Sequence, residues 1–440
     1  MGVFDVPFHR WSRSSWTDRL LLGVTGALLA CTAALAALPS LWEGLVGATV
    51  VAMGGLIWLR RRDVLSMGTV LWGAVGLRLL FLPLLPELTD DPFRYLWDGW
   101  LQIEGVNPYR FVPKADALAP FQESVLFREM NSQPYYSIYP PLSQLTFVLG
   151  GMGQLVDWRL GYYLLKLLYT VVELGGVALL ARMTTARNVL LYAWHPVVLL
   201  ETAGQGHTEA LLVPLLLGLV WAVRHGRAAT ASMAVAGAGL VKLYPFVLGP
   251  FLVRRFGWRA VWPGALVAGL CSLPYAAPYV VPHMKASVDL FSELFEFNAG
   301  PYYLVKYVFW VGTGADWSKV IGPVFRGMFI ATLPVLYAVD AWRDWPLRRA
   351  ILWTIGLLFV LSTTVHPWYL VPLLALGVLD ESPPWHWFWL ATASVGTYLF
   401  YVGGTYWLWI LLGWGGAGGI ALWRHRTTVR GLVQTVRGST

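Results

Sequence analysis

The stretch LLLGVTGALLACTAALAAL, residues 20–38, decides the class of fold, and LWEGLVGATVVAMGGLIWL follows it at residues 41–59. The first stretch contains no charged residue. An apolar run of about 20 residues crosses a hydrocarbon layer of about 30 Å as a helix, whereas an open sheet would leave backbone polar groups unpaired in the lipid. Because similar runs recur, for example at residues 261–280, the sequence predicts an all-α polytopic membrane protein.

Composition supports this class. Of the 440 residues, 57% are hydrophobic and 13% are charged, and the mean hydropathy is +0.57. A soluble chain would carry a charged fraction of about 25%. The net charge of +8 comes from short basic clusters between apolar runs, not from one contiguous patch. We therefore expect cytoplasmic loops and no nucleic-acid partner. The clusters fall at residues 60–62, 182–187, 224–227, 254–259, 343–349 and 424–430.

Placing every basic cluster on the cytoplasmic side predicts the topology. The N-terminus is then expected to lie on the cytoplasmic side, and about 12 to 14 spans follow it. Residues 1–440 are expected to form one membrane domain. Residues 86–141 become the first external loop, and residues 281–319 become the second. Residues 142–156 are apolar but short, and a crossing there would move every later cluster outside. We therefore expect a re-entrant or interfacial helix at this point.

The first external loop begins with LTDDPFRYLWDG, residues 88–99. Asp90 and Asp91 follow the end of a span, at the depth where a lipid-linked donor presents its phosphate. Transfer of a phosphate-linked group needs a base for the acceptor hydroxyl and cations for the departing phosphate. A like-charged neighbour and partial burial would raise the pKa of such a base. Arg94 lies one helical turn further on and could face the same pocket.

Charged and polar groups near the ends of spans supply further candidates, because a charge inside a span is costly unless it is paired or lines a cavity. For the donor phosphate we expect Arg94, Lys242, Lys306 and His366 as ligands. For the transferred group and the acceptor we expect contacts from Trp97, Tyr139, Glu201, His207, Glu209 and Tyr302.

Other polar and small residues favour structural roles. Lys166 and Glu173 lie two helical turns apart and are expected to pair with each other. Arg78 is expected to reach the interface or to pair with Glu87 or Asp90. The glycine-rich run at residues 415–419 is expected to allow close packing of helices.

Four motifs carry a resemblance to a known superfamily. The first runs from Asp90 to Gly99 and continues through GVNPY at residues 105–109. The others are IYPPLSQ at 138–144, WHP at 194–196 with GHTE at 206–209, and HPWYL at 366–370. Together they resemble GT-C glycosyltransferases, and are most similar to bacterial polyprenol-phosphate-mannose-dependent α-mannosyltransferases. Many relatives have Asn-Asp where this chain has Thr208-Glu209.

This resemblance implies a GT-C-type fold with surface-lying helices in the first external loop. It implies inverting transfer of a hexose, with mannose expected, from a polyprenyl-phosphate sugar donor to an acceptor hydroxyl. The first acidic residue of the pair, Asp90, would be the general base, and Asp91 would tune or share that role. The expected location is the bacterial inner membrane, as a multi-pass protein with its active site on the external side. The acceptor could be a glycan, a lipid or a protein.

Two alternatives concern the cofactor and the class of protein. Asp90 and Asp91 could hold Mg²⁺ or Mn²⁺ with a third oxygen ligand. Because Arg and Lys alone can hold a lipid monophosphate, we expect an enzyme without a cofactor. A transporter or flippase for lipid-linked sugars would also need charged groups, but near the bilayer midplane and often within internal repeats. The densest polar motif here lies in a predicted external loop.

Overall fold

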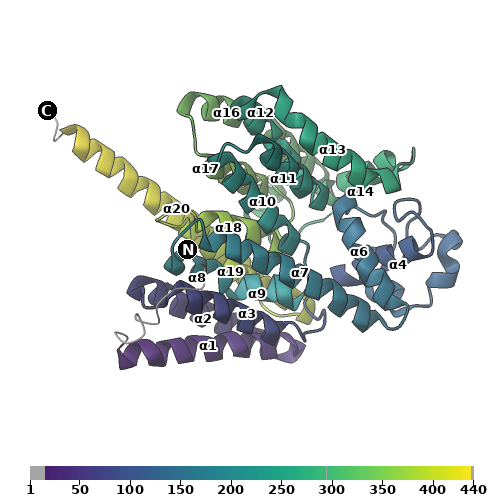
Figure 1. Cartoon of the computed structure of the whole chain (residues 1–440), viewed down its shortest axis with the longest axis horizontal. Coiled ribbons are helices and arrows are strands. Elements are labelled where there is room, and N and C mark those ends of the chain that lie inside the picture. Colours follow the sequence, from purple (N-terminus) through teal and green to yellow (C-terminus); the bar gives the residue numbers. More distant parts are fainter. Residues whose placement is uncertain (1–14, 294, 438–440) are drawn as a thin grey trace.

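The computed structural model describes residues 15–293 and 295–437, and within these residues the fold is helical apart from one isolated bridge between Phe297 and Thr364. Helices α1 (Trp16–Ala36), α2 (Trp42–Arg62) and α3 (Met67–Phe81) form a group at one side (Figure 1). Ser15 begins α1 with a capping box, and its partner Asp18 also binds Arg62 from the end of α2. This contact joins the start of the first helix to the end of the second.

A separate lobe forms at the opposite end of the molecule from α20 (Figure 1). It contains α4 (Asp91–Ile103), η3 (Asp116–Phe121) and α5 (Val125–Glu129), which surround a small apolar core of their own. Helix α6 (Pro141–Gln154) packs directly on α4. A Cβ added to Gly99 would lie 1.9 Å from the carbonyl oxygen of Phe147, so only glycine permits this crossing.

The central part of the molecule is built from helices that break and bend. These are α7 (Trp158–Ala181), α8 (Ala186–Ala193), α9 (Pro196–Leu199), η4 (Leu200–Gly204), α10 (Glu209–Arg224) and α11 (Ala228–Val241). The segment Pro196–Gly204 meets α10 at 117°. Gly206 lies in this bend with a φ of +76°, which a residue with a side chain adopts at a cost. The bend brings the side chains of Gln205 and His207 to the segment where the lobe begins.

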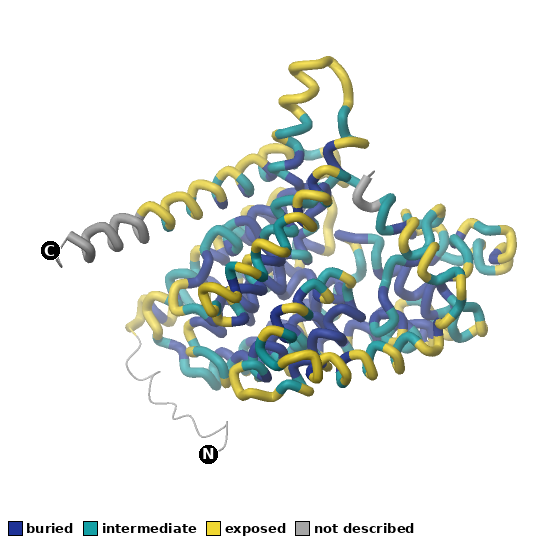
Figure 2. Tube along the Cα trace, turned by 90° about the horizontal axis from the view of Figure 1, so that it is seen from above, coloured by how far each residue is buried: buried dark blue, intermediate teal, exposed yellow. Residues whose placement is uncertain are grey.

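The second half of the chain completes the bundle. Its helices are η5 (Tyr244–Leu248), α12 (Gly249–Phe256), η6 (Trp258–Ala260), α13 (Val261–Ser272), η7 (Leu273–Tyr275), α14 (Val280–Glu293), α15 (Gly300–Thr313), α16 (Ser318–Arg343), α17 (Leu347–Val360), η8 (Pro367–Leu370), α18 (Val371–Gly377), α19 (Trp385–Ser394), η9 (Val395–Val402) and α20 (Tyr406–Arg437). Helix α20 leaves the body of the bundle (Figure 1). Buried residues fill the centre, and exposed ones follow the outer helices and the part of α20 before residue 427 (Figure 2).

The all-helical membrane class is confirmed. Among the described residues, four helices are long and apolar enough to cross a membrane, and the number rises to six if each of two bent pairs is one span. These are α1, residues 39–62, α7 and α16, with the pairs at residues 196–224 and 258–290. This criterion counts fewer than the 12 to 14 spans expected. Two of the apolar runs are divided by a bend, and three others form helices shorter than 18 residues.

Two expected charge pairings were wrong. Arg78 binds Glu173 through two hydrogen bonds of 2.5 and 2.8 Å, and both side chains are fully buried. It therefore neither reaches the interface nor pairs with Glu87 or Asp90. Lys166 does not meet Glu173, but donates to the backbone oxygens of Leu82 and Leu84 at 2.8 and 2.7 Å. These carbonyls lie beyond the end of α3, so Lys166 holds the chain that leads to the lobe.

Candidate active site

The acidic pair lies where the chain enters the lobe. Asp90 precedes the first turn of α4, and Asp91 is its first residue, followed by a proline that suits this position. The side chain of Gln205 accepts a hydrogen bond from the backbone N–H of Leu88 at 3.2 Å. The bend after η4 therefore fixes the segment that presents the two carboxylates.

The two carboxylates have different surroundings. Asp90 accepts a hydrogen bond of 2.8 Å from the backbone N–H of Asn131 in the lobe. Burial raises the pKa of Asp90, although this hydrogen bond opposes the shift. Asp91 instead faces the bent span: one of its oxygens accepts from the hydroxyl of Tyr95 at 3.2 Å and lies 3.8 Å from Nδ1 of His207.

Asp91 has the properties expected of a base. Burial raises its pKa to about 7, and the charges of Asp90 and Glu209 contribute in the same direction. The cation of Lys242 and the hydrogen bond from Tyr95 oppose this rise. Its side chain is still 31% exposed, so a substrate can reach it. A reachable carboxylate that titrates near neutral pH suits proton abstraction from a hydroxyl.

His207 connects Asp91 to the interior. Its ring stacks on Trp368 with centroids 3.8 Å apart, and its Nε2 lies 3.3 Å from an oxygen of the fully buried Glu201. The other oxygen of Glu201 accepts from the hydroxyl of Tyr398 at 2.8 Å. The imidazole is thus held in one plane, with a carboxylate at each ring nitrogen. Within the described residues neither ring nitrogen makes a hydrogen bond at these distances, so His207 and Glu201 lie behind Asp91 with unused hydrogen-bonding groups.

Lys242 supplies a positive charge beside Asp91. It forms an ion pair with Glu209 from the first turn of α10, and its ammonium lies 4.4 Å from the centre of the Tyr369 ring. The Lys242 side chain is 18% exposed, whereas that of Glu209 is 1% exposed. The cation therefore remains reachable while its partner is buried. Many relatives are expected to have Asp where this chain has Glu209. In this chain Glu209 holds the lysine in place.

His366 extends the aromatic stack. Its ring lies between Trp368, at a centroid distance of 4.2 Å, and Phe297, at 4.7 Å. Burial, with a smaller effect of the Lys242 cation, lowers the pKa of His366 to about 3. The ring is therefore neutral near pH 7, so it can donate one hydrogen bond but brings no positive charge to a phosphate.

Arg94 is directed away from Asp91. Its Nε donates to Asp98 at 2.8 Å, and its Nη1 donates to the backbone oxygens of Ser132 and Tyr135. The opposite oxygen of Asp98 accepts from Ser137 at 2.5 Å and from Gln144 at 2.8 Å. Arg94 and Asp98 together hold the loop of the lobe against α4 and α6. Arg94 thus has a structural role in the lobe, while its Nη2 has no hydrogen-bond partner among the described residues, and its contact with phosphate stays a prediction.

The remaining predicted residues divide into two groups. Tyr139 belongs to the site, since its ring meets that of Tyr95 edge to face at 4.9 Å. Trp97 is fully buried in the core of the lobe against Phe121 and Phe127, so it offers no surface to a sugar.

Tyr302 and Lys306 lie on α15, and both bind Glu296. The structure does not bring these two residues to Asp91. They form a separate group beyond Phe297.

Three residues of the site were missed by the sequence analysis as individual candidates: Tyr95, Trp368 and Tyr398. Tyr95 had a local signal, because it follows Asp91 by four residues on one helix face. Trp368 lay in a quoted motif without an assigned role. Tyr398 had no signal, since it is 197 positions from its partner Glu201.

A helical membrane fold with a reachable carboxylate beside a buried aromatic stack and a lysine has the groups that a membrane glycosyltransferase needs. A family model described as alpha-(1->6)-mannopyranosyltransferase, N-terminal domain, matches residues 10–256, which is more than half of the chain. The chain therefore belongs to this family, whose members are GT-C mannosyltransferases that use polyprenol-phosphate-mannose donors. Searches of curated proteins and of solved structures give no match.

The family assignment confirms the class and the activity expected from the sequence: a transmembrane mannosyltransferase with a mannose donor and an acceptor. A transporter or flippase is therefore not the function. The matched residues include the acidic pair, the bend at residues 204–209 and Lys242, whereas His366, Trp368 and Tyr398 lie beyond them. Among the described residues, no group of three His, Cys, Asp or Glu side chains could hold a metal ion.

Proposed function

We propose that this protein transfers mannose, with inversion, from a polyprenyl-phosphate donor to an acceptor hydroxyl at the outer face of the membrane, and that Asp91 is the general base. The observation that carries this proposal is the environment of Asp91: a reachable carboxylate with a pKa of about 7 that faces His207 and Lys242. Asp90 binds the backbone at Asn131, so its role is to raise the pKa of its neighbour.

The reaction needs one proton transfer and one displacement. The acceptor oxygen attacks the anomeric carbon of mannose and loses its proton to Asp91, while the bond from that carbon to the phosphate oxygen breaks. The electron pair of the broken bond leaves with the polyprenyl phosphate. Attack from the face opposite the phosphate converts a β-linked donor into an α-linked product.

Lys242 is suited to receive the departing phosphate. Its ammonium is partly exposed beside Asp91, and Glu209 and the face of Tyr369 hold it in position. A preorganised cation in a site of low water content stabilises charge that develops on the leaving group. Tyr139 and His366, which are only partly buried, supply aromatic and polar surface for the sugar. These assignments leave His207 and Glu201 behind Asp91 as positioning residues.

The outer face follows from the basic clusters. They fall between apolar runs on the side opposite the lobe in the predicted topology, and cytoplasmic loops carry such an excess of lysine and arginine. Residues 86–141 would then be an external lobe above the membrane. The family description supports a hydroxyl at position 6 of a mannose unit as the acceptor.

The test uses purified protein in nanodiscs with polyprenyl-phosphate mannose and a short α-mannoside, and product linkage is determined by NMR. Asp91→Asn should lower kcat by about 100- to 10,000-fold, because it removes the base, while donor binding is retained. Asp90→Asn, the matched control, should cost less, since it only lowers the pKa of Asp91. Transfer by Asp91→Asn at the wild-type rate would refute this assignment.

A further inference from the structure

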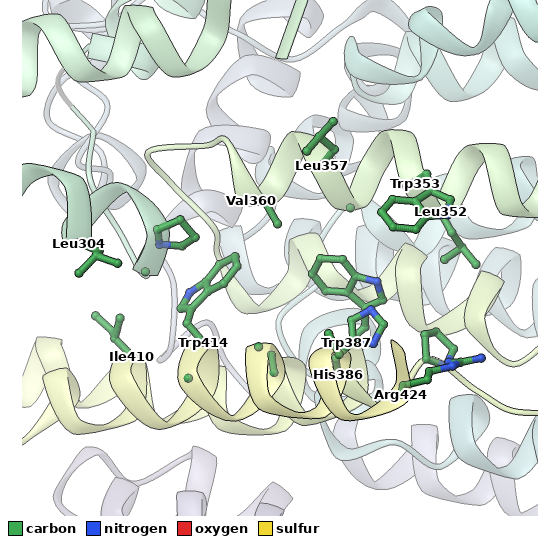
Figure 3. A pocket seen from close by; sticks show the side chains of 18 of the residues that line it. Leu304, Leu352, Trp353, Leu357, Val360, His386, Trp387, Ile410, Trp414 and Arg424 are labelled. Atoms are coloured by element: carbon green, nitrogen blue, oxygen red, sulfur yellow. The ribbon is translucent and has the colours of Figure 1, made fainter. Parts of the chain in front are cut away.

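A large groove lies between α15, α17 and α20 (Figure 3). Its volume is about 2080 Å³, well above the range of about 300–1000 Å³ for pockets that hold small ligands. In Figure 3 the labelled side chains form a row from Leu304 and Ile410 at one end to Leu352 and Arg424 at the other, with Trp387 between them. Among the described residues that line the groove there is no side chain of the active site, so the groove is a separate feature of the fold.

One wall of the groove is helix α20, whose glycine-rich run keeps it wide. A Cβ added to Gly415 or to Gly418 would meet no atom within 4 Å, and both residues line the groove. Gly416 instead makes a close contact, since a Cβ there would lie 2.2 Å from Nε1 of Trp389. The expectation that residues 415–419 allow close packing of helices therefore holds at Gly416, whereas the two lining glycines leave room for an apolar occupant.

The two ends of the groove differ in charge. At the end formed by α15, the carboxylates of Glu296 and Asp316 lie 2.8 and 3.8 Å from a single cation, the ammonium of Lys306. Two carboxylates beside one cation leave an excess of negative charge. This end therefore repels an anionic group.

The opposite end lies where basic clusters from distant parts of the sequence meet. Three arginines, Arg60, Arg348 and Arg424, donate hydrogen bonds of 2.7–3.1 Å to the loop at residues 380–383. Arg348 binds the carboxylate of Asp380, whereas Arg60 and Arg424 bind backbone oxygens of the loop. A backbone oxygen holds a guanidinium in position without neutralising its charge. The fold thus gathers positive charge at the end of the groove that the sequence predicts to be cytoplasmic.

Two further polar groups face this end. Arg349 is exposed and lines the groove, and its guanidinium lies 4.9 Å from the centre of the Trp345 ring. Nδ1 of His386, another lining residue, is buried with no hydrogen-bond partner among the described residues. A guanidinium can bind two oxygens of one phosphate, and an imidazole can donate to a third. The basic end therefore has the groups that bind a phosphate.

We propose that this groove binds an anionic phospholipid of the cytoplasmic leaflet, with its phosphate at Arg349, Arg424 and His386 and its acyl chains along the apolar wall toward α15. Basic pockets between membrane helices on the cytoplasmic side bind anionic headgroups in this way. The negative charge at the α15 end excludes the reverse orientation. This inference does not depend on the proposed function, because the residues that carry it lie outside the active site.

The first experiment tests the headgroup. The purified full-length protein is titrated with phosphatidylglycerol and with phosphatidylcholine of identical acyl chains, and the bound lipid is counted by native mass spectrometry. The wild-type protein should bind phosphatidylglycerol more tightly. Arg349→Gln should weaken phosphatidylglycerol binding about fivefold and leave phosphatidylcholine binding unchanged. Arg343→Gln is the matched control, because Arg343 belongs to the same basic cluster and also lies over a tryptophan ring, that of Trp342, but does not line the groove.

The second experiment tests the path of the acyl chains. Gly418→Leu places a side chain in the groove, and Gly419→Leu is its control, because a Cβ added to Gly419 also meets no atom within 4 Å but Gly419 does not line the groove. Gly418→Leu should weaken the binding of both lipids to the same extent, since the chains are common to both. Gly419→Leu should leave binding unchanged. The melting temperature in lipid-free detergent serves as the folding control for every variant.

Four results would overturn the proposal. Equal affinity of the wild-type protein for the two lipids would remove the anionic headgroup. An equal loss in Arg343→Gln and Arg349→Gln would indicate diffuse attraction to the whole basic surface. Unchanged binding in Gly418→Leu would place the acyl chains elsewhere. A dimer in the native mass spectra that is lost in Gly418→Leu would assign the groove to a second copy of this chain. If Arg349→Gln does not fold, Arg349→Lys and the glycine pair still decide, because Arg349→Lys keeps the charge and should keep the preference for phosphatidylglycerol.

Discussion

At the scale of single residues, the site depends on how differently two adjacent carboxylates are surrounded. Asp90 turns to the backbone of the lobe, and Asp91 turns to the bent span with His207 and Lys242 nearby. The sequence showed the pair and its chemistry, and the family resemblance gave the role of base to Asp90. The surroundings of the two side chains instead support the proposal that Asp91 is the base. The two surroundings differ because the side chains of Asp90 and Asp91 point to different sides at the start of α4.

The pKa of Asp91 predicts a pH dependence. A general base works only when deprotonated, and its pKa is raised from 3.8 to about 7. The value of kcat/KM should therefore fall about tenfold per pH unit below about pH 7 and reach a plateau above it. The measurement is a rate profile from about pH 5 to about pH 9 with a saturating acceptor. The charged groups facing Asp91 are Asp90, Glu209 and Lys242, with neutral His207 between Asp91 and Glu201.

Asp90→Asn removes one neighbouring negative charge, so it should move the midpoint of this profile to lower pH while keeping its shape. A profile that is flat between about pH 5 and about pH 8 would show that an ordinary carboxylate, or no carboxylate, accepts the proton. It would contradict the assignment of Asp91.

At the scale of elements, the position of the base depends on the crossing of α4 and α6. Gly99 and Gly151 allow the two backbones to touch, since a Cβ on Gly151 would lie 2.3 Å from the carbonyl carbon of Gly99. Glycine in a helix normally costs about 1 kcal/mol relative to alanine, so its presence at a crossing reflects a packing demand. Both helices were expected from the sequence, but their contact was not.

Gly151→Ala should therefore separate the two helices and displace the start of α4. We expect a loss of thermal stability of about 1–3 kcal/mol from overpacking, together with reduced kcat, measured by thermal denaturation and by the transfer assay. Gly76→Ala is the control, because a Cβ added to Gly76 would meet no atom within 4 Å. Gly105→Ala is not suitable, because the positive φ of Gly105 would strain an alanine. Equal stability of Gly151→Ala and Gly76→Ala would contradict the close crossing.

At the scale of the whole molecule, buried polar contacts join distant segments. The pair of Arg78 and Glu173 links α3 to α7, and Arg78 also donates to the backbone oxygen of Ala193 at the end of α8. Glu201 and Tyr398 link the bent span to η9. The Arg78 contacts join early helices to one another, and the contact between Glu201 and Tyr398 joins them to the last part of the chain.

Arg78→Met should be strongly destabilising, because it leaves the Glu173 carboxylate buried without a cation. Loss of one partner of a buried pair costs about 3–5 kcal/mol, while replacing both partners with apolar residues is often neutral. Thermal denaturation should therefore show a large loss for Arg78→Met and recovery in Arg78→Met/Glu173→Leu. Lys285→Ala, which breaks a pair whose lysine is 73% exposed, should change little. Equal stability of the two single variants would contradict the buried pair.

The sequence by itself determined the helical membrane class, the family resemblance and the acidic pair, because apolar length and short motifs are local properties of the chain. It also located the residues around 201–209 and His366 near the site. Only the tertiary structure decided that Arg94 serves the lobe, that Arg78 binds Glu173, and that Asp91 is the carboxylate beside Lys242. These outcomes depend on contacts between segments 95 or more residues apart or on the direction of a side chain, and neither is encoded in local spacing.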